Sequence, residues 1–238
     1  MNNKTYKHGL HDGIAVALGY FAVSFTFGME AVTNGLSIWQ AALISLTNVT
    51  SAGQFSGLGI IAAGGTYLEL ALTQFIINLR YCLMSFSLAQ KLDKTASNRH
   101  RYTIAYSVTD EIFALDVSQT GDLQPFYHYG ITSIAVPGWV LGTLVGAISG
   151  SLLPAFIMSA LGIAIYGMFL AIIIPPAKKN RTVFIVVLAA MALSFLFAVL
   201  PVFKQITSGF VIILTTVIVA GIAAKLKPIE NESGTSNN

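Results

Sequence analysis

The feature that most constrains this chain is a long stretch, residues 123–177, that contains no Asp, Glu, Lys or Arg. Two further uncharged runs follow it, at 182–203 and 205–224. A helix needs about 20 apolar residues to cross the hydrocarbon core of a bilayer. The first run is therefore long enough for two crossings, and each of the others for one. All three are apolar on every face and do not alternate with polar positions, which argues against a transmembrane β-barrel.

Composition supports the same class. The 238 residues are 55% hydrophobic and 10% charged, with a mean hydropathy of +0.72, whereas soluble domains carry roughly 25% charged residues. We therefore predict an all-α, polytopic transmembrane helix bundle of about six to eight membrane segments, placed in a bacterial inner membrane. The net charge of +3 is too small to indicate nucleic acid. The single cysteine, Cys82, excludes an internal disulfide, and we predict no metal site and no cofactor.

Hydropathy and helix breakers divide the chain into eight helical segments. Their predicted bounds are 13–33, 36–64, 67–91, 102–120, 127–150, 153–175, 182–201 and 206–224. We predict a polar cytoplasmic leader at 1–12, a single transmembrane domain at 13–225 and a disordered polar tail at 226–238.

Two of these segments are irregular. The second contains a polar and small-residue run from Thr47 to Gln54, which predicts a broken or re-entrant helix. The segment 102–120 carries three acids, so it is amphipathic and need not cross. If neither segment crosses, six crossings remain and both termini lie in the cytoplasm. All clusters of basic residues then lie inside, as the positive-inside rule favours; they are Lys4, Lys7, Lys91, Lys94, Arg99, Arg101, Lys178, Lys179, Arg181, Lys225 and Lys227.

Four glycines at a spacing of four form a ladder along one face of the segment 127–150. They are Gly138, Gly142, Gly146 and Gly150. Small residues at this spacing let helix backbones approach closely. The ladder predicts tight packing, either on another helix of the same chain or on a partner subunit.

Arg80 lies about halfway along the segment 67–91, too far from either end to reach water easily. A charge at the bilayer centre costs at least ~2.5 kcal/mol, so it should face a partner or a wet cavity, with Asn78 close by. One interpretation is a buried salt bridge that fixes helix register. The other is that Arg80 binds a substrate carboxylate or tunes a proton-carrying acid.

The acids available to Arg80 include the neighbours Asp110 and Glu111. On a helix they diverge by about 100°, so at most one faces Arg80. They are either the charged start of an amphipathic helix, which the helix dipole favours, or proton-coupling residues. Glu30 and Glu69 fall near segment ends and are predicted to be interfacial, and the aromatic cluster around His128 is predicted to be an interfacial belt.

Several short stretches together resemble one family. They are Phe27-Gly28 through Gly35-Leu36-Ser37, Ser51-Ala52-Gly53-Gln54-Phe55, Asn78-Leu79-Arg80-Tyr81, Thr109-Asp110-Glu111-Ile112-Phe113-Ala114-Leu115 and Gly142-Thr143-Leu144-Val145-Gly146. Their order and spacing, over roughly residues 9–200, resemble the AzlC/YgaZ family, the large subunits of bacterial branched-chain amino acid exporters. The resemblance implies a two-component exporter of leucine, isoleucine, valine and their analogues, with a small AzlD/YgaH-like membrane subunit as the partner.

A branched-chain amino acid is a zwitterion with an apolar side chain, and the broken second segment has suitable parts for one. Asn48, Ser51 and Gln54 offer polar contacts, Gly53 permits close backbone approach, and Phe55 offers an apolar wall. With Asn78 and Arg80, these are the predicted substrate-binding residues. The chain has no nucleotide-binding motif, so uphill export would use an ion gradient, most simply protons carried by Asp110 or Glu111.

Two rival functions come from other classes. A non-transporting membrane scaffold would use the glycine ladder to stabilise a partner, but would leave Arg80 and the polar broken segment with little purpose. An intramembrane enzyme would need a matched nucleophile and base, or a paired aspartate, at membrane depth. The sequence shows neither, and we predict that the chain is not an enzyme.

Overall fold

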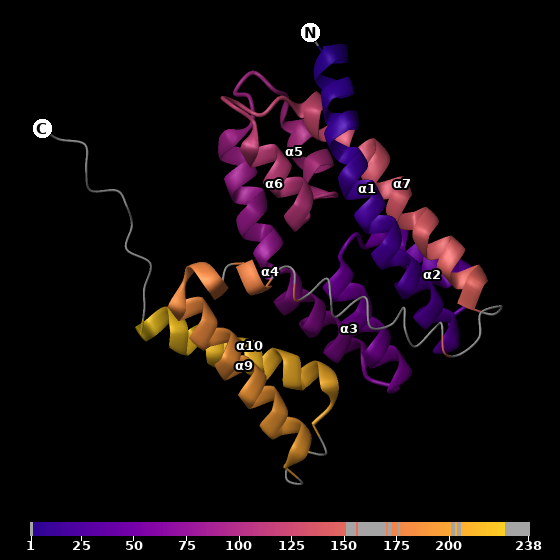
Figure 1. Cartoon of the computed structure of the whole chain (residues 1–238), viewed down its shortest axis with the longest axis vertical. Coiled ribbons are helices and arrows are strands. Elements are labelled where there is room, and N and C mark those ends of the chain that lie inside the picture. Colours follow the sequence, from indigo (N-terminus) through magenta and orange to yellow (C-terminus); the bar gives the residue numbers. More distant parts are fainter. Residues whose placement is uncertain are drawn as a thin grey trace, which may run out of the picture.

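The computed structural model describes residues 2–150, 177–200 and 206–226, together with residues 156, 170, 173–175 and 203. Within these residues the chain is helical, which confirms the predicted all-α bundle (Figure 1). The elements are α1 (Asn2–Thr33), α2 (Ile38–Thr47), α3 (Ser51–Ala62), α4 (Tyr67–Lys91), α5 (Asn98–Ala105), α6 (Asp110–Ser118), α7 (Pro125–Gly150), α9 (Arg181–Val199) and α10 (Ser208–Leu226).

Four of the described helices are long and apolar enough to cross a membrane. They lie at Asn3–Thr33, Pro125–Gly150, Arg181–Val199 and Gly209–Leu226. The chain is therefore a multi-pass membrane protein. The predicted leader belongs to α1, which begins at Asn2. The predicted segment 153–175 lies outside the described residues apart from isolated positions, and so does the predicted tail beyond Leu226.

The glycine ladder packs on α1, so its partner lies in the same chain. Gly138 faces Ala17, and an added Cβ would lie 3.0 Å from the Ala17 carbonyl oxygen. At Gly142 and Gly146 an added Cβ would overlap the carbonyl oxygens of Phe21 and Phe25. Gly150 continues the row against Met29. Residue numbers increase in the same direction along the two contacting faces, so α1 and α7 run parallel. They stay in contact along most of their length (Figure 1).

The predicted broken second segment is confirmed. Helix α2 ends at Thr47, residues 48–50 leave the helical conformation, and α3 begins at Ser51. The segment 102–120 is broken in the same way, which the sequence interpretation did not predict. Helix α5 ends at Ala105 and α6 begins at Asp110. We call these two elements the α2–α3 hairpin and the α5–α6 hairpin.

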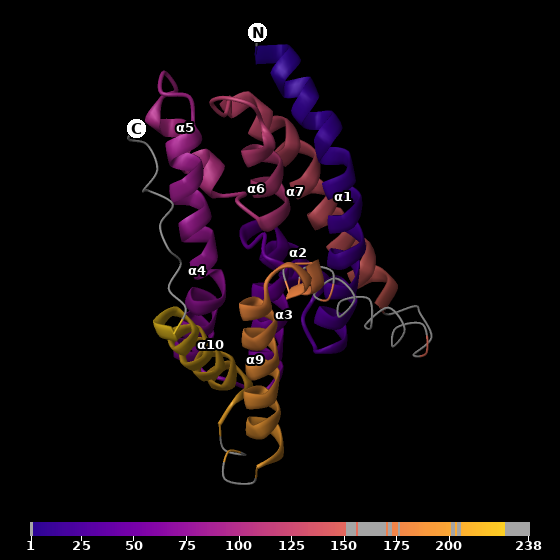
Figure 2. The same cartoon turned by 60° about the vertical axis from the view of Figure 1, so that its left-hand side comes forward.

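The two hairpins enter the bundle from opposite ends, and their tips meet in the middle (Figure 2). The α2–α3 hairpin starts where α1 ends and returns to the start of α4. The α5–α6 hairpin starts after α4 and returns to the start of α7, at the end of the molecule where α1 begins. At the tips, the Tyr106 hydroxyl donates to the carbonyl oxygen of Leu46 at 2.5 Å.

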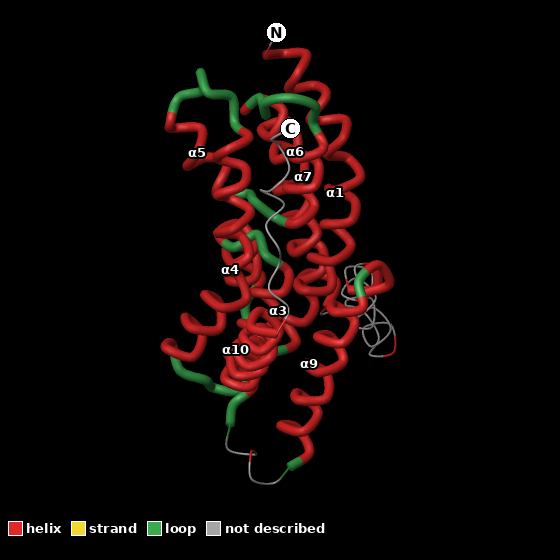
Figure 3. Tube along the Cα trace, turned by 90° about the vertical axis from the view of Figure 1, so that its left-hand side faces the viewer, coloured by secondary structure: helices red, strands yellow, loops and turns green. Residues whose placement is uncertain are grey.

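Helix α4 runs antiparallel to α1 and α7. Its first half packs on α3, where Gln74 Nε2 donates to the Gly53 carbonyl oxygen at 2.7 Å. Its last residues pair with the strand-like segment before α7, through Leu123 N–H to Lys91 O at 2.8 Å. That neither hairpin crosses the membrane stays a prediction. Figure 3 shows that the described part of the chain consists of helices joined by loops and turns.

Helices α9 and α10 pack on each other, and α10 also contacts α4 and α3. The contact depends on Glu69, which is only 2% exposed. Its carboxylate accepts hydrogen bonds from the Thr207 hydroxyl and, at 3.1 Å, from Gly209 N–H at the start of α10. The location of Glu69 at the membrane interface stays a prediction; within the chain its carboxylate caps the start of α10 by accepting from the Gly209 N–H.

Candidate functional site

A cavity of about 330 Å³ lies where the two hairpin tips meet α1, α4 and α7. Its walls are mainly apolar, formed in part by Val16, Val23, Val49 and Trp139. Its polar groups converge from the hairpin tips and the flanking helices; they are Ser51, Tyr20, Tyr81, Thr109, Asp110 and Glu111. A mostly apolar cavity of this size with a few convergent polar groups is typical of a small-molecule site.

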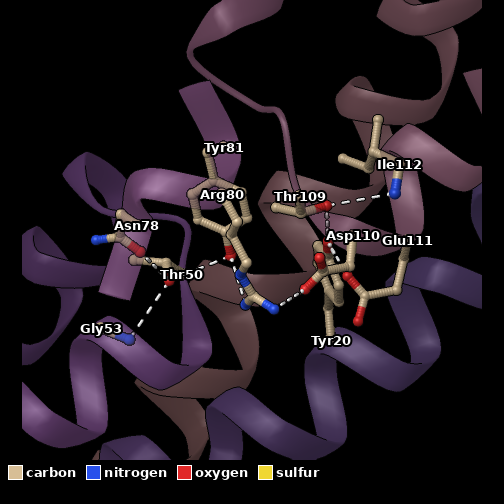
Figure 4. A network of polar contacts seen from close by, with 10 residues as sticks. All are labelled: Tyr20, Thr50, Gly53, Asn78, Arg80, Tyr81, Thr109, Asp110, Glu111 and Ile112. Atoms are coloured by element: carbon tan, nitrogen blue, oxygen red, sulfur yellow. Dashed lines mark hydrogen bonds and ion pairs between the residues drawn. The ribbon is translucent and has the colours of Figure 1, made fainter. Parts of the chain in front are cut away.

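The N-terminus of α3 forms one side of the site (Figure 4). Thr50 is its N-cap, and the threonine hydroxyl accepts from Gly53 N–H at 3.4 Å. The same hydroxyl accepts from Tyr81 at 3.2 Å and donates to Asn78 Oδ1 at 2.9 Å. No acid occupies the first turn of α3, so the positive end of its dipole is not neutralised and can attract an anion near Ser51.

The N-terminus of α6 forms the facing side with a similar cap. The Thr109 hydroxyl accepts from Ile112 N–H at 3.3 Å and shares a short hydrogen bond with the Tyr20 hydroxyl. Tyr20 donates in turn to Glu111 Oε2 at 3.0 Å. Here the first turn carries Asp110 and Glu111. These carboxylates neutralise the helix dipole and make this side of the cavity attractive to a cation.

Arg80 contacts the α6 side directly and the α3 side through Tyr81, whose hydroxyl bonds Thr50. Its Nη1 lies 2.9 Å from Asp110 Oδ2, and its Nη2 lies 3.4 Å from the Tyr81 hydroxyl (Figure 4). The guanidinium also lies over the Tyr81 ring, 5.0 Å from its centroid. As predicted, only one of the two adjacent acids pairs with Arg80. Both side chains of the pair are partly exposed, at 38% and 27%, so the pair is not sealed in the core and a ligand could compete for it.

The structure divides the predicted substrate-binding residues. Ser51 lines the cavity together with the predicted proton-coupling residues Asp110 and Glu111. Asn48, Gly53 and Gln54 line a second cavity of about 220 Å³ between α2, α3 and α4. Phe55 lies at neither, because its ring packs edge-on against Phe27, with centroids 5.5 Å apart.

Gln54 is a structural residue. It is 2% exposed, its Oε1 accepts from Trp139 Nε1 at 2.9 Å, and its Nε2 donates to Ser45 Oγ at 2.9 Å. Ser45 then bonds the Thr143 hydroxyl at 2.6 Å. Through these hydrogen bonds Gln54 ties the α2–α3 hairpin to α7. Asn78 likewise braces Thr50, so it shapes the site through the α3 cap.

Sequence reasoning missed four residues that build the site: Thr50, Thr109, Tyr20 and Tyr81. A signal was present. Each hairpin break carries Val-Thr directly before the second helix, as Val49-Thr50 and Val108-Thr109, and threonine is a favoured N-cap. No group of three or more His, Cys, Asp or Glu side chains in the described part of the chain is arranged to hold a metal ion.

Comparison with known proteins agrees with this architecture. A family model described as AzlC protein matches residues 15–153, which include α1 from residue 15 onward, both hairpins, α4 and α7. An uncharacterized membrane protein of Archaeoglobus fulgidus is 30% identical over 192 residues, covering 80% of this chain and 84% of the relative. The inner membrane protein YgaZ of Escherichia coli is 26% identical over 185 residues, covering 75% and 76% of the two chains.

Another relative, an uncharacterized membrane protein of Helicobacter pylori, is 27% identical over 152 residues, covering 62% of this chain and 65% of the relative. No solved structure matches the chain. The family match covers more than half of the sequence and includes every residue of the cavity described above. The chain belongs to the AzlC family.

Proposed function

We propose that this protein is a subunit of an inner-membrane exporter for branched-chain amino acids and their analogues, and not an enzyme. The observation that carries the proposal is the cavity in which a neutral and an acidic helix N-terminus face each other across apolar walls. Discontinuous helices whose ends meet near the middle of a bundle are the usual substrate sites of secondary transporters.

The two sides suit the two charges of a zwitterion. The substrate carboxylate would bind near Ser51 at the N-terminus of α3, within reach of Arg80. The ammonium group would bind the carboxylates of Asp110 and Glu111 at the facing helix. The branched side chain would lie against apolar residues such as Val49 and Trp139. Size and apolarity favour leucine, isoleucine and valine over amino acids with charged side chains.

Uphill export requires a driving force, and we propose the proton gradient. Asp110 and Glu111 remain the predicted proton carriers at the cavity, because a proton on Asp110 would weaken its attraction for Arg80. The resemblance of this chain to a family of two-component exporters supports a small AzlD/YgaH-like membrane partner. Since α1 covers the glycine ladder, such a partner would bind another face of the chain.

The test is efflux of preloaded radiolabelled leucine from cells that make this chain with or without the small partner, with and without a protonophore. We expect leucine efflux that needs both subunits and falls when the protonophore is added, with lysine as a substrate that is not exported. If the two chains are abundant and form a complex but leucine leaves no faster than from empty cells, the export proposal is wrong. If this chain only raises the abundance of its partner, it is a scaffold.

A further inference from the structure

A second polar cluster is buried outside the cavity, between α6 and α7. His128 Nδ1 lies 2.6 Å from Asp116 Oδ2, and His128 Nε2 lies 2.9 Å from Ser107 Oγ. Ser107 also bonds the Thr132 hydroxyl at 3.0 Å. The side chains of His128 and Asp116 are both 0% exposed, and Ser107 is buried as well. The prediction of an interfacial belt around His128 is therefore wrong.

This arrangement is fully hydrogen-bonded at His128 in two protonation states. With a neutral imidazole, Nδ1–H donates to Asp116, and Nε2 accepts the Ser107 hydroxyl proton, while Ser107 accepts from Thr132. With one added proton on Nε2, the imidazolium donates to both Asp116 and Ser107, and the Ser107 hydroxyl turns to donate to Thr132. The change needs only the rotation of two hydroxyl groups, because all heavy atoms are already at hydrogen-bonding distance.

We propose that the Asp116–His128–Ser107 cluster is a proton-binding site that couples proton movement to the α5–α6 hairpin. This inference rests on the proposed export function, and it places a proton site away from the substrate cavity. The cluster adds a second proton site to the carriers proposed at the cavity, Asp110 and Glu111: one proton is taken up on the imidazole or the carboxylate, and the same proton is later released. No bond other than N–H or O–H forms or breaks.

Burial and charge support a proton site over a passive tie. With a neutral His128, the ionised Asp116 leaves a net negative charge in the core, whereas one added proton makes the pair neutral. Because adding one proton removes a net charge from the buried core, the pair is expected to bind that proton strongly. Asp116 Oδ1 is also buried and has no hydrogen-bond partner among the described residues, so it is a free acceptor for a proton.

The charged and titratable groups around the pair are few. From α4, Lys91 attracts Asp116 electrostatically, while its Nζ donates to the carbonyl oxygens of Val117 and Gln119. From α7, Tyr127 interacts with Asp116 but donates its hydroxyl to Asp12 of α1 at 2.7 Å. From α5, His100 bonds Tyr129, whose ring lies beside His128. None of these groups occupies the unpartnered Asp116 oxygen.

The link to the substrate site is the α5–α6 break itself. Ser107 lies two residues before Thr109, the N-cap that lines the cavity and contacts Tyr20. Protonation reverses the direction of the Ser107 hydroxyl at this non-helical segment. A proton bound at His128 therefore changes the hydrogen bonding of the segment that positions Thr109 and Asp110. This is the kind of differential contact that couples two sites.

The test separates exchange from proton-driven transport in liposomes that contain the purified protein and its partner. Asp116→Asn should keep leucine–leucine exchange close to wild type, because the cavity is intact. It should lose about tenfold of the uptake driven by an imposed pH gradient, a typical loss for a broken coupling between two sites. A pH-sensitive dye should show that leucine movement moves fewer protons than in wild type. Asp122→Asn, an exposed acid on the loop before α7, is the matched control and should change neither activity.

Two results would overturn the inference. One is an Asp116→Asn protein that still uses the pH gradient fully; the other is parallel loss of exchange and gradient-driven transport, which marks a structural tie. If Asp116→Asn is poorly recovered, Ser107→Ala decides, because it removes the hydroxyl relay and keeps the ion pair. Unchanged proton coupling in Ser107→Ala then contradicts the proposal.

A separate readout distinguishes failure of the proton site from failure of the export function. In protein labelled with ¹⁵N-histidine, the His128 signal, assigned from His128→Gln, should change protonation with pH, and Asp116→Asn should shift that pH range. A His128 signal that does not change between about pH 5 and 9, well to both sides of the ordinary histidine pKa, overturns the site even if leucine is exported. If the wild-type protein shows no leucine exchange, the export proposal is wrong, and the His128 titration alone then tests the proton site.

Discussion

The two hairpins use the same backbone design but give opposite electrostatic surfaces. Each begins at a serine N-cap, Ser37 or Ser97, breaks before a Val-Thr pair, and resumes as a helix capped by the threonine. Each threonine hydroxyl bonds a tyrosine of a long helix, Tyr81 of α4 for Thr50 and Tyr20 of α1 for Thr109. The units α1–α2–α3 and α4–α5–α6 therefore each consist of a long helix followed by a broken hairpin, and the two hairpins enter the bundle from opposite ends.

The difference lies in the first turn after each threonine. Helix α3 begins with Ser51-Ala52, and α6 begins with Asp110-Glu111. A helix N-terminus without an acid attracts anions, and one with two carboxylates attracts cations. Repetition of the backbone therefore creates a site with two facing helix ends, and the change of two residues gives these ends opposite preferences for charge, as the proposed zwitterionic substrate requires. Arg80 then balances the acidic side when no ligand is bound.

Removing the charge that joins the two hairpins should have the largest effect. Arg80→Gln should lower leucine efflux about 10- to 100-fold, because a hydrogen bond to a charged group contributes ~1.5–3 kcal/mol and each 1.4 kcal/mol is a factor of ten. Protein abundance should hold, since the pair is partly exposed and such ion pairs add little stability. The measurement is efflux per amount of membrane protein on a blot, with the exposed Arg101→Gln as the control.

A double variant sharpens this prediction. If Arg80 mainly neutralises Asp110, Arg80→Gln alone should lower abundance, and adding Asp110→Asn should restore it. If Arg80 binds the substrate carboxylate, both variants should be as abundant as wild type but inactive, and this is the result that we expect. Wild-type efflux by the single variant at normal abundance would contradict both roles.

Making the α3 end resemble the α6 end should break the comparison directly. Ser51→Asp adds a carboxylate where the substrate carboxylate is proposed to bind, so leucine efflux at low internal leucine should fall about tenfold through like-charge repulsion. An acid at a helix N-terminus is itself favourable, so the variant should fold as well as wild type. Ser51→Asn has nearly the same shape without the charge and should keep most activity. Equal activity of the two variants would remove α3 from the substrate site.

The two caps can be compared by matched substitutions. Thr→Ala at a helix N-cap costs about 1 kcal/mol, and both Thr50→Ala and Thr109→Ala should lower the melting temperature of the purified protein. Thr50→Ala should be the more destabilising, because the Thr50 hydroxyl also donates to Asn78 and accepts from Tyr81. Thr→Ser at either position keeps the hydroxyl and should restore most of the loss. A larger effect at Thr109 would show that the caps differ in a way these contacts do not explain.

Sequence reasoning could predict the class of fold, the broken second segment and the pairing of Arg80 with one of two acids. Each follows from a local cost: uncharged length, polar residues at membrane depth, and a charge far from water. The second break, at Ser107, was not predictable in the same way. The three acids in the segment 102–120 are already explained by a single amphipathic helix, so they gave no reason to expect a break. The roles of Gln54 and Phe55 also escaped, since polar and aromatic side chains that satisfy a core look the same in sequence as those that bind a ligand.

The glycine ladder illustrates what sequence pattern leaves open. Its spacing predicted a close helix contact, and the contact exists, but the pattern holds no information on which helix supplies it. In the structure this helix is α1, whose backbone contacts each glycine of the ladder. Long-range pairing of this kind depends on how the two hairpins fill the space between α1, α4 and α7, which no short stretch of sequence specifies.

The smallest predicted effect is at the base of the α5–α6 hairpin, where Asp93 fixes the loop after α4. Its Oδ1 accepts from Thr95 Oγ1 at 2.7 Å and Thr95 N–H at 2.8 Å, and its Oδ2 accepts from Gln124 Nε2 at 2.8 Å. These hydrogen bonds hold the pKa of the Asp93 carboxyl below its ordinary value. The α2–α3 hairpin begins at the corresponding turn with no such carboxylate, so this acid sensitivity belongs to one hairpin alone.

Because the folded-state pKa of Asp93 is lowered, its stabilising contribution is present above the unfolded pKa, about 3.9, and is lost as pH falls through the folded pKa. Asp93→Asn should therefore lower the melting temperature slightly at pH 7, and the difference from wild type should shrink as the pH falls below about 4. Melting curves of both proteins at several pH values measure this, with Asp122→Asn, at an exposed acid of the loop before α7, as the control. A difference that stays constant with pH would show that Asp93 acts through packing and not through its charge.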